Sequence, residues 1–134
     1  MSIDPKRFAN EYQNALVEVA LPAFARAGEF ARDHGLECSV ELREGRRDLP
    51  ELVLSVRDVC QAADCVCRIS ADPSTQRLCH ENRCGETEAD VQRVVGSIAS
   101  LNERVLDTRL LEFFQEAFAL HLDYASRRHA GGFW

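Results

Sequence analysis

A chain of 134 residues can bury one hydrophobic core, and its 46% apolar and 28% charged residues are typical of a folded globular protein. That balance excludes a disordered polar chain. The formal net charge of −6 argues against non-specific binding to nucleic acid, which relies on clustered cations. The sequence has no apolar run of ~18 residues, so we expect a cytoplasmic protein without a membrane segment. We predict a single domain over 1–134, with a flexible tail at 130–134.

The first element in chain order is a long helix. Asp4 and Pro5 form a helix start, because aspartate caps free amide groups and proline suits the first helical position. Apolar residues then recur every three or four positions, at Phe8, Tyr12, Ala15, Leu16, Val19, Ala20, Ala23, Phe24, Ala27, Phe30 and Ala31. Pro22 predicts a kink or a short break near Leu21. Gly35 predicts the end of the helix.

The middle of the chain has the two-residue period of β-strands. Apolar and polar residues alternate over 38–43 and 52–57, which predicts two half-buried strands joined by a polar loop. A third strand follows over 65–71. The chemistry of Asp72-Pro73-Ser74-Thr75 predicts a type I turn, and the fourth strand then runs from Gln76 to about Asn82.

The region after Gly85 predicts helix. Thr87 begins a sequence that resembles a capping box. The apolar residues that follow have helical spacing, at Val91, Val94, Val95, Ile98 and Leu101. The stripe shifts its phase around 106–108 and resumes over 110–122. Either one helix bends there or two helices meet with Asp107 as the second cap, and we favour the break.

These elements predict an α+β fold. It comprises an N-terminal helix, a four-stranded antiparallel meander, and one or two C-terminal helices packed on one sheet face. Consecutive strands joined by short loops favour the meander, because neighbouring strands are then simply antiparallel hairpins.

Most of the cysteines lie in one cysteine-rich hairpin, over 60–84. It contains Cys60, Cys65, Cys67, Cys79, His80 and Cys84. Structural zinc takes four tetrahedral nitrogen or sulfur ligands, commonly from CxxC pairs, and the sequence has no CxxC. Because a cytoplasm keeps thiols reduced, we favour free core thiols over disulfides. The alternative is a zinc site whose ligands are Cys65, Cys67, His80 and Cys84, with Cys79 able to replace His80.

The zinc alternative depends on how the third and fourth strands pair. If Ala71 pairs with Gln76, then Cys67 lies opposite His80. Cys65 lies on the same face as Cys67, so two thiols and a third donor converge. If the register slips by one residue, Cys79 replaces His80 opposite one of the cysteines.

No Walker loop, dinucleotide-binding, zinc-protease, nucleophile-elbow or calcium-loop motif is present. We therefore assign no catalytic and no cofactor-binding residues, and we expect a protein that is not an enzyme. The acidic composition and the absent motifs favour a non-enzymatic module that binds another protein, in the manner of an adaptor or chaperone. The size and charge resemble those of small acidic bacterial secretion chaperones, without a shared motif. A zinc-stabilised domain and a small-molecule-binding α+β protein are the alternatives.

The C-terminal helix has a wider apolar surface than one sheet face requires. Phe114 and Phe118 belong to the main apolar stripe, and Phe113 and Leu120 lie off it and would form a second seam. A helix that is apolar on two sides is either sandwiched inside the fold or shared with a second subunit. Since two-fold dimers are the commonest oligomers, we predict a homodimer that associates through this helix.

Overall fold

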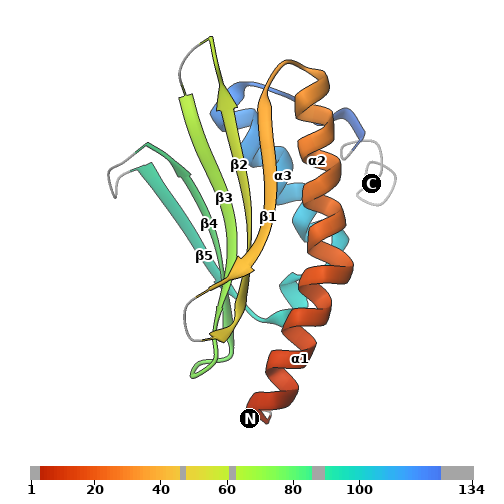
Figure 1. Ribbon diagram of the computed structural model, residues 1–134, viewed down its shortest axis with the longest axis vertical. Helices are drawn as coiled ribbons and strands as arrows, with labels where there is room; N and C mark the ends of the chain where they lie inside the picture. The colour runs from red at the N-terminus through yellow and green to blue at the C-terminus, as the bar shows by residue number, and fades with distance from the viewer. Residues whose placement is uncertain (1–3, 46–47, 61–62, 86–89, 125–134) are drawn as a thin grey trace, which may run out of the picture.

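The helices lie on one face of a five-stranded antiparallel sheet (Figure 1). The computed structural model describes residues 4–45, 48–60, 63–85 and 90–124. The α+β class is confirmed, but the sheet has five strands and not the predicted four. The predicted tail at 130–134 lies outside the described residues.

The N-terminal helical segment begins and ends as the sequence predicts. It comprises α1 (Pro5–Ala15), a π-helical segment (Leu16–Ala20) and α2 (Leu21–Asp33). The Asp4 carboxylate caps α1 by accepting a hydrogen bond from the Lys6 amide at 2.8 Å. The wider π-helical turn comes just before Pro22, whose ring is incompatible with a regular preceding turn. After α2 the chain reverses at Gly35, which has a φ of 90° that favours glycine.

The strands follow one another across the sheet in chain order. They are β1 (Glu37–Glu44), β2 (Pro50–Asp58), β3 (Ala63–Asp72), β4 (Arg77–Cys84) and β5 (Val91–Gly96). All neighbouring pairs are antiparallel. The edges of the sheet are therefore β1, which lies beside α2, and β5, at the side away from α2 (Figure 1).

β5 occupies a segment for which the sequence pattern predicts a helix. The valine spacing around Val94 and Val95 fits a helical stripe, but β-branched residues also favour strands. In the structure Arg93 lies opposite Glu81 on β4, and Val95 lies opposite Cys79. Backbone pairing with β4 decides the conformation, because short apolar runs fit both patterns.

The C-terminal helix is a single element that begins upstream of the predicted cap. A short 3-10 turn (Ile98–Ser100) leads into α3 (Glu103–Phe118). Asn102 caps α3, since its side chain accepts a hydrogen bond from the Val105 amide at 2.9 Å. The prediction of Asp107 as a helix cap is wrong. Asp107 lies inside the helix, 1% exposed, with its carboxylate 4.0 Å from the Arg26 guanidinium of α2.

The β3–β4 loop gives these strands a different register from the one predicted. The Asp72 carboxylate accepts a hydrogen bond from the Ser74 amide at 2.9 Å. The Asp72 carbonyl accepts a second one from the Gln76 amide, and Gln76 has a φ of 56°. Gln76 is thus the last loop residue rather than the first strand residue. Ala71 consequently pairs with Leu78 and not with Gln76, which moves the pairing by two residues.

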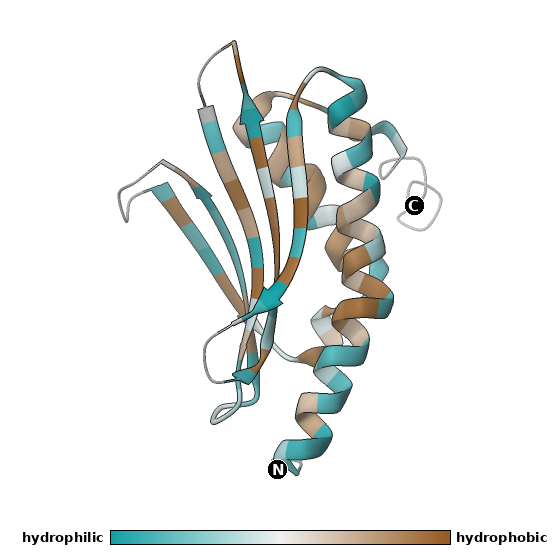
Figure 2. Ribbon diagram, in the orientation of Figure 1, coloured by the Kyte–Doolittle hydropathy of each residue, from teal (hydrophilic) through white to brown (hydrophobic). Residues whose placement is uncertain are grey.

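One core fills the space between the helices and the sheet. Hydrophobic and hydrophilic residues alternate along much of the sheet (Figure 2), and most of the apolar strand residues belong to the core that the helices cover. The most deeply buried large side chains are Tyr12, Phe8, Phe24, Phe113, Phe114, Leu16, Leu52, Leu54, Ile69, Leu78, Leu106 and Leu110.

Tyr12 ties α1 to the sheet through a buried hydrogen bond. Its hydroxyl donates to the Pro50 carbonyl at 2.6 Å. Tyr12→Phe is expected to lower the free energy of unfolding by about 1–2 kcal/mol, because the Pro50 carbonyl loses its buried donor. Urea unfolding checks this. Tyr124→Phe is the matched control, since the buried Tyr124 hydroxyl has no hydrogen-bond partner among the described residues. A loss in Tyr124→Phe as large as in Tyr12→Phe would contradict the assignment.

Candidate protein-interaction edge

The sheet face that points away from the helices is polar and internally paired. This open face carries Glu51 on β2, Arg68 on β3 and Glu81 on β4. Arg43 donates to the Glu51 carboxylate at 2.7 Å. Val53 belongs to the same face but is only 4% exposed, and it lies between Glu41 of β1 and Arg68 of β3. The open face is therefore not an apolar docking surface.

An ionic triad crosses three strands of the open face. Arg68 of β3 and Arg93 of β5 both lie opposite Glu81 of β4. Their guanidinium groups donate to the two different carboxylate oxygens of Glu81, at 2.8 and 2.9 Å. The Glu81 side chain is only 8% exposed, so these bonds form in a partly desolvated place. The triad holds the only charged side chain of β5 against the sheet.

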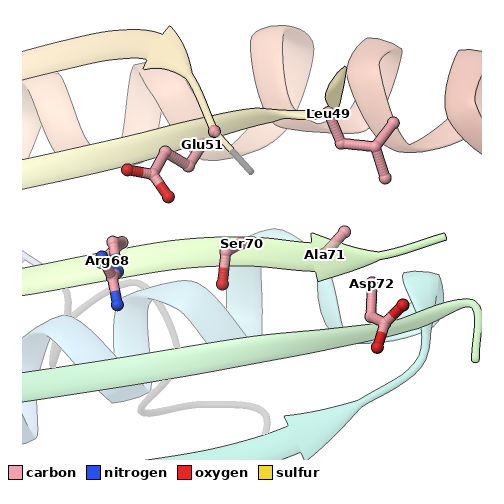
Figure 3. Close-up of a pocket in the computed structure, with 7 residues that line it drawn as sticks. Leu49, Glu51, Arg68, Ser70, Ala71 and Asp72 are labelled. Carbon is pink, nitrogen blue, oxygen red and sulfur yellow. The ribbon is translucent and has the colours of Figure 1, made fainter. Parts of the chain in front are cut away.

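A shallow pocket of about 210 Å³ opens on the same face (Figure 3). Glu51 of β2 lies across from Arg68, Ser70 and Asp72 of β3 (Figure 3). The charged groups around it are already used, since Glu51 pairs with Arg43 and Arg68 pairs with Glu81. Typical small-molecule sites enclose about 300–1,000 Å³. This pocket by itself gives little support to the small-molecule alternative, whereas a second pocket of about 480 Å³, over β1, β2 and β3, falls within that range.

The structure brings together two of the four proposed zinc ligands, and joins them to each other. Cys65 and Cys84 are directly opposite across β3–β4, with Cα atoms 4.3 Å apart, and form a disulfide. Cys67 instead lies opposite Asn82. The Nε2 atom of His80 lies 2.9 Å from the hydroxyl oxygen of Ser100, a residue of the 3-10 turn that follows β5. The register considered for the zinc site is thus not the one that forms, and the expectation of free thiols is wrong for Cys65 and Cys84. Both differences arise from the β3–β4 loop, which sets how the two strands pair.

Metal binding stays a prediction. Among the described residues, no group of three or more histidine, cysteine, aspartate or glutamate side chains is arranged to hold a metal ion. The cysteines that remain free there are Cys38, Cys60, Cys67 and Cys79. Elemental analysis of the reduced protein, in which Cys65 and Cys84 are thiols again, tests the zinc alternative.

The free thiols near the core are poor nucleophiles. Burial raises the pKa of Cys67 to about 12, and the nearby Arg109 guanidinium opposes this only in part. Burial also raises the pKa of Cys38 and of Cys79. A reactive cysteine needs a lowered pKa, and these three environments have the opposite effect.

The aromatic residues predicted for self-association lie within the monomer core. Phe113 is 2% exposed and Phe114 is fully buried, and their rings stack edge to face, 5.2 Å apart. Phe118 and Leu120 are partly buried and pack against the same core. α3 is thus sandwiched inside the fold, and its width gives no support to a dimer through this helix.

The free edge of β5 is the least protected apolar part of the described residues. Val94 points to the helix side and is 47% exposed, while Val95 points to the open face and is 58% exposed. Among the described residues β5 pairs only with β4, so one row of its backbone amide and carbonyl groups faces away from the sheet. We call this the β5 edge. The sequence pattern missed it because it assigned both valines to a helical stripe.

The opposite edge of the sheet differs in character. β1 carries charged residues at four of its eight positions, namely Glu37, Glu41, Arg43 and Glu44. Charges on an edge strand discourage pairing with other chains. β5 contains no proline and one charge, Arg93, which Glu81 already binds. Among the described residues, the β5 edge therefore lacks the proline and the several charges by which many proteins discourage strand addition.

Comparisons of the chain with protein-family models, characterised proteins and solved structures find no match. Within the part of the chain that the structure describes, no helix is both long and apolar enough to cross a membrane. The geometry of the β5 edge is therefore the main guide to function.

Proposed function

We propose that this protein is a non-enzymatic binding module that accepts an extended segment of another polypeptide along the β5 edge. The observation that carries the proposal is the exposure of Val94 and Val95 on opposite faces of an unprotected edge strand. A module that holds an extended segment in this way acts as an adaptor or a chaperone.

Strand addition supplies both affinity and selectivity. The outward amide and carbonyl groups of β5 hydrogen bond to any extended backbone, irrespective of its sequence. Side chains of the added strand then alternate between the two faces. Those on the helix side meet Val94, and those on the open face meet Val95 and the stem of Arg93. We therefore expect a bound segment with apolar residues at neighbouring positions, and no need for a catalytic group.

Selection of displayed random peptides on the full-length protein tests this proposal. Peptides that bind are labelled and titrated against wild type, Val94→Lys and Val95→Lys. Lysine on an edge strand opposes strand addition, so each variant is expected to bind at least about tenfold more weakly. Val17→Lys is the matched control, because Val17 is similarly exposed, at 40%, but lies in the N-terminal helical segment.

Two results would contradict the proposal. One is a selection that enriches no peptide. The other is peptides that bind Val94→Lys and Val95→Lys as tightly as they bind wild type. Thermal unfolding of each variant is measured in parallel, so that loss of binding is not confused with loss of the fold.

A further inference from the structure

We propose that the segment received by the β5 edge is the β5 strand of a second copy of this chain. The two copies then form a two-fold dimer with one continuous ten-stranded sheet, five strands from each chain. This inference rests on the proposed function, because it assigns an occupant to the same edge. It replaces α3, whose aromatic residues are buried, as the surface for self-association.

The sequence of β5 is complementary to itself. A two-fold axis perpendicular to the sheet and passing between the two Val94 residues pairs Val94 with its own copy. Gln92 then lies opposite Gly96, and Arg93 lies opposite Val95. Each pair lies on one face, as antiparallel pairing requires. The two half-exposed Val94 side chains cover one another on the helix side.

The charge distribution of β5 is also compatible with the register that places the two-fold axis at Val94. Arg93 is the only charged residue of β5, and a shift of the axis to Arg93 would set two arginines directly opposite each other. With the axis at Val94 the two guanidinium groups are displaced along the strands. Each is also bound by Glu81 of its own chain at 2.9 Å, so repulsion between the copies is small. The charged β1 edge offers no comparable self-pairing.

The helix side of β5 is partly open. Val94 is 47% exposed there, so the helices leave it partly uncovered. A groove of about 290 Å³ also lies between β4, β5 and α3, and its lining includes Gln92, Phe113 and Glu116. The contact is nevertheless short, and stable interfaces usually bury more than about 1,000 Å². We therefore expect a weak dimer whose formation depends on protein concentration.

Sedimentation equilibrium of the full chain, from about 1 to 500 µM, is the first test. Wild type is expected to pass from monomer to dimer across this range. Val94→Lys is expected to self-associate at least about tenfold more weakly, because its two charges meet on the axis. Val17→Lys is expected to behave as wild type.

Cysteine cross-linking tests the register itself. Cys60 is exposed and Cys79 lies opposite Val95 within the chain, so both are first replaced by serine. Val94→Cys is expected to form a covalent dimer on mild oxidation, because directly opposed Cβ atoms lie about 4.5–5.5 Å apart. Val95→Cys is the control, since the two copies of this residue are diagonal neighbours, about 7–8 Å apart, and are expected to cross-link far less.

The results of these experiments distinguish a failure of the proposed dimer from a failure of the proposed peptide binding, on which the dimer rests. A wild type that stays monomeric at every concentration overturns the dimer, and peptide binding lost in Val94→Lys would still uphold strand addition. A dimer that persists unchanged in Val94→Lys also overturns the inference, because the contact must then lie elsewhere. Equal cross-linking of Val94→Cys and Val95→Cys overturns the register. Failure of both dimerisation and peptide binding overturns both proposals.

Discussion

Glu81→Gln is expected to lower the free energy of unfolding by about 2–3 kcal/mol, more than a typical surface substitution. The Glu81 carboxylate is almost buried and neutralises two arginines, Arg68 and Arg93. Glutamine removes the negative charge that lies between the two guanidinium groups in a partly desolvated place. Removing one partner of a buried ion pair costs about 3–5 kcal/mol, and the partial exposure of the two arginines, 34% and 45%, reduces that figure.

This effect is measured by chemical denaturation of wild type and of Glu81→Gln, and Glu11→Gln is the matched control. Glu11 accepts a hydrogen bond from Arg7 at 2.9 Å, but that pair is exposed, so its loss is expected to change stability by less than about 0.5 kcal/mol. If the two variants lose the same stability, the triad has no special role. Because Glu81 also orients Arg93, its variant is expected to weaken binding at the β5 edge as well.

Stability is expected to fall by about 2–3 kcal/mol between pH 6.5 and pH 4 because of His80. Burial, helped by the Arg109 guanidinium, lowers the pKa of this histidine from 6.5 to about 4. Between these values the unfolded chain binds a proton that the folded chain does not bind, so acidification favours unfolding. Well above pH 6.5 His80 is neutral in both states and contributes no pH dependence.

The contribution of His80 is isolated by comparing wild type with His80→Gln. Carboxylates also titrate towards pH 4, and the difference between the two proteins removes their common effect. The variant is expected to be less stable at pH 7, where it disturbs the contact with Ser100, but to lose less stability on acidification. Parallel pH profiles for the two proteins would show that His80 is not the group responsible.

Local patterns were sufficient for the first helix and for four of the strands. Asp4, Pro22 and Gly35 act on the backbone within one or two turns, and the structure has the helix start, the interruption and the helix end where they predict them. The alternation over 38–43 and 52–57 could likewise be recognised within each segment. Every strand of a sheet that is covered on one face carries the same apolar and polar pattern.

The candidate site could not be predicted in the same way. Val94 and Val95 fit a helical stripe as well as a strand, and only the backbone of β4 beside them decides between the two. Their exposure depends on which distant parts of the chain cover each face of the sheet, and no local pattern encodes this. The β5 edge is therefore a property of the assembled sheet.

The amino-acid sequence by itself determined the α+β class, the helix-first order and the existence of the first four strands, since these depend on neighbours along the chain. Only the tertiary structure decided the register of β3 and β4, because the backbone of Gln76 takes up a positive φ that its side chain does not predict. That register places Cys65 opposite Cys84. The tertiary structure likewise decided that Phe113 faces the core and that β5 is an edge, because both depend on which distant surfaces meet.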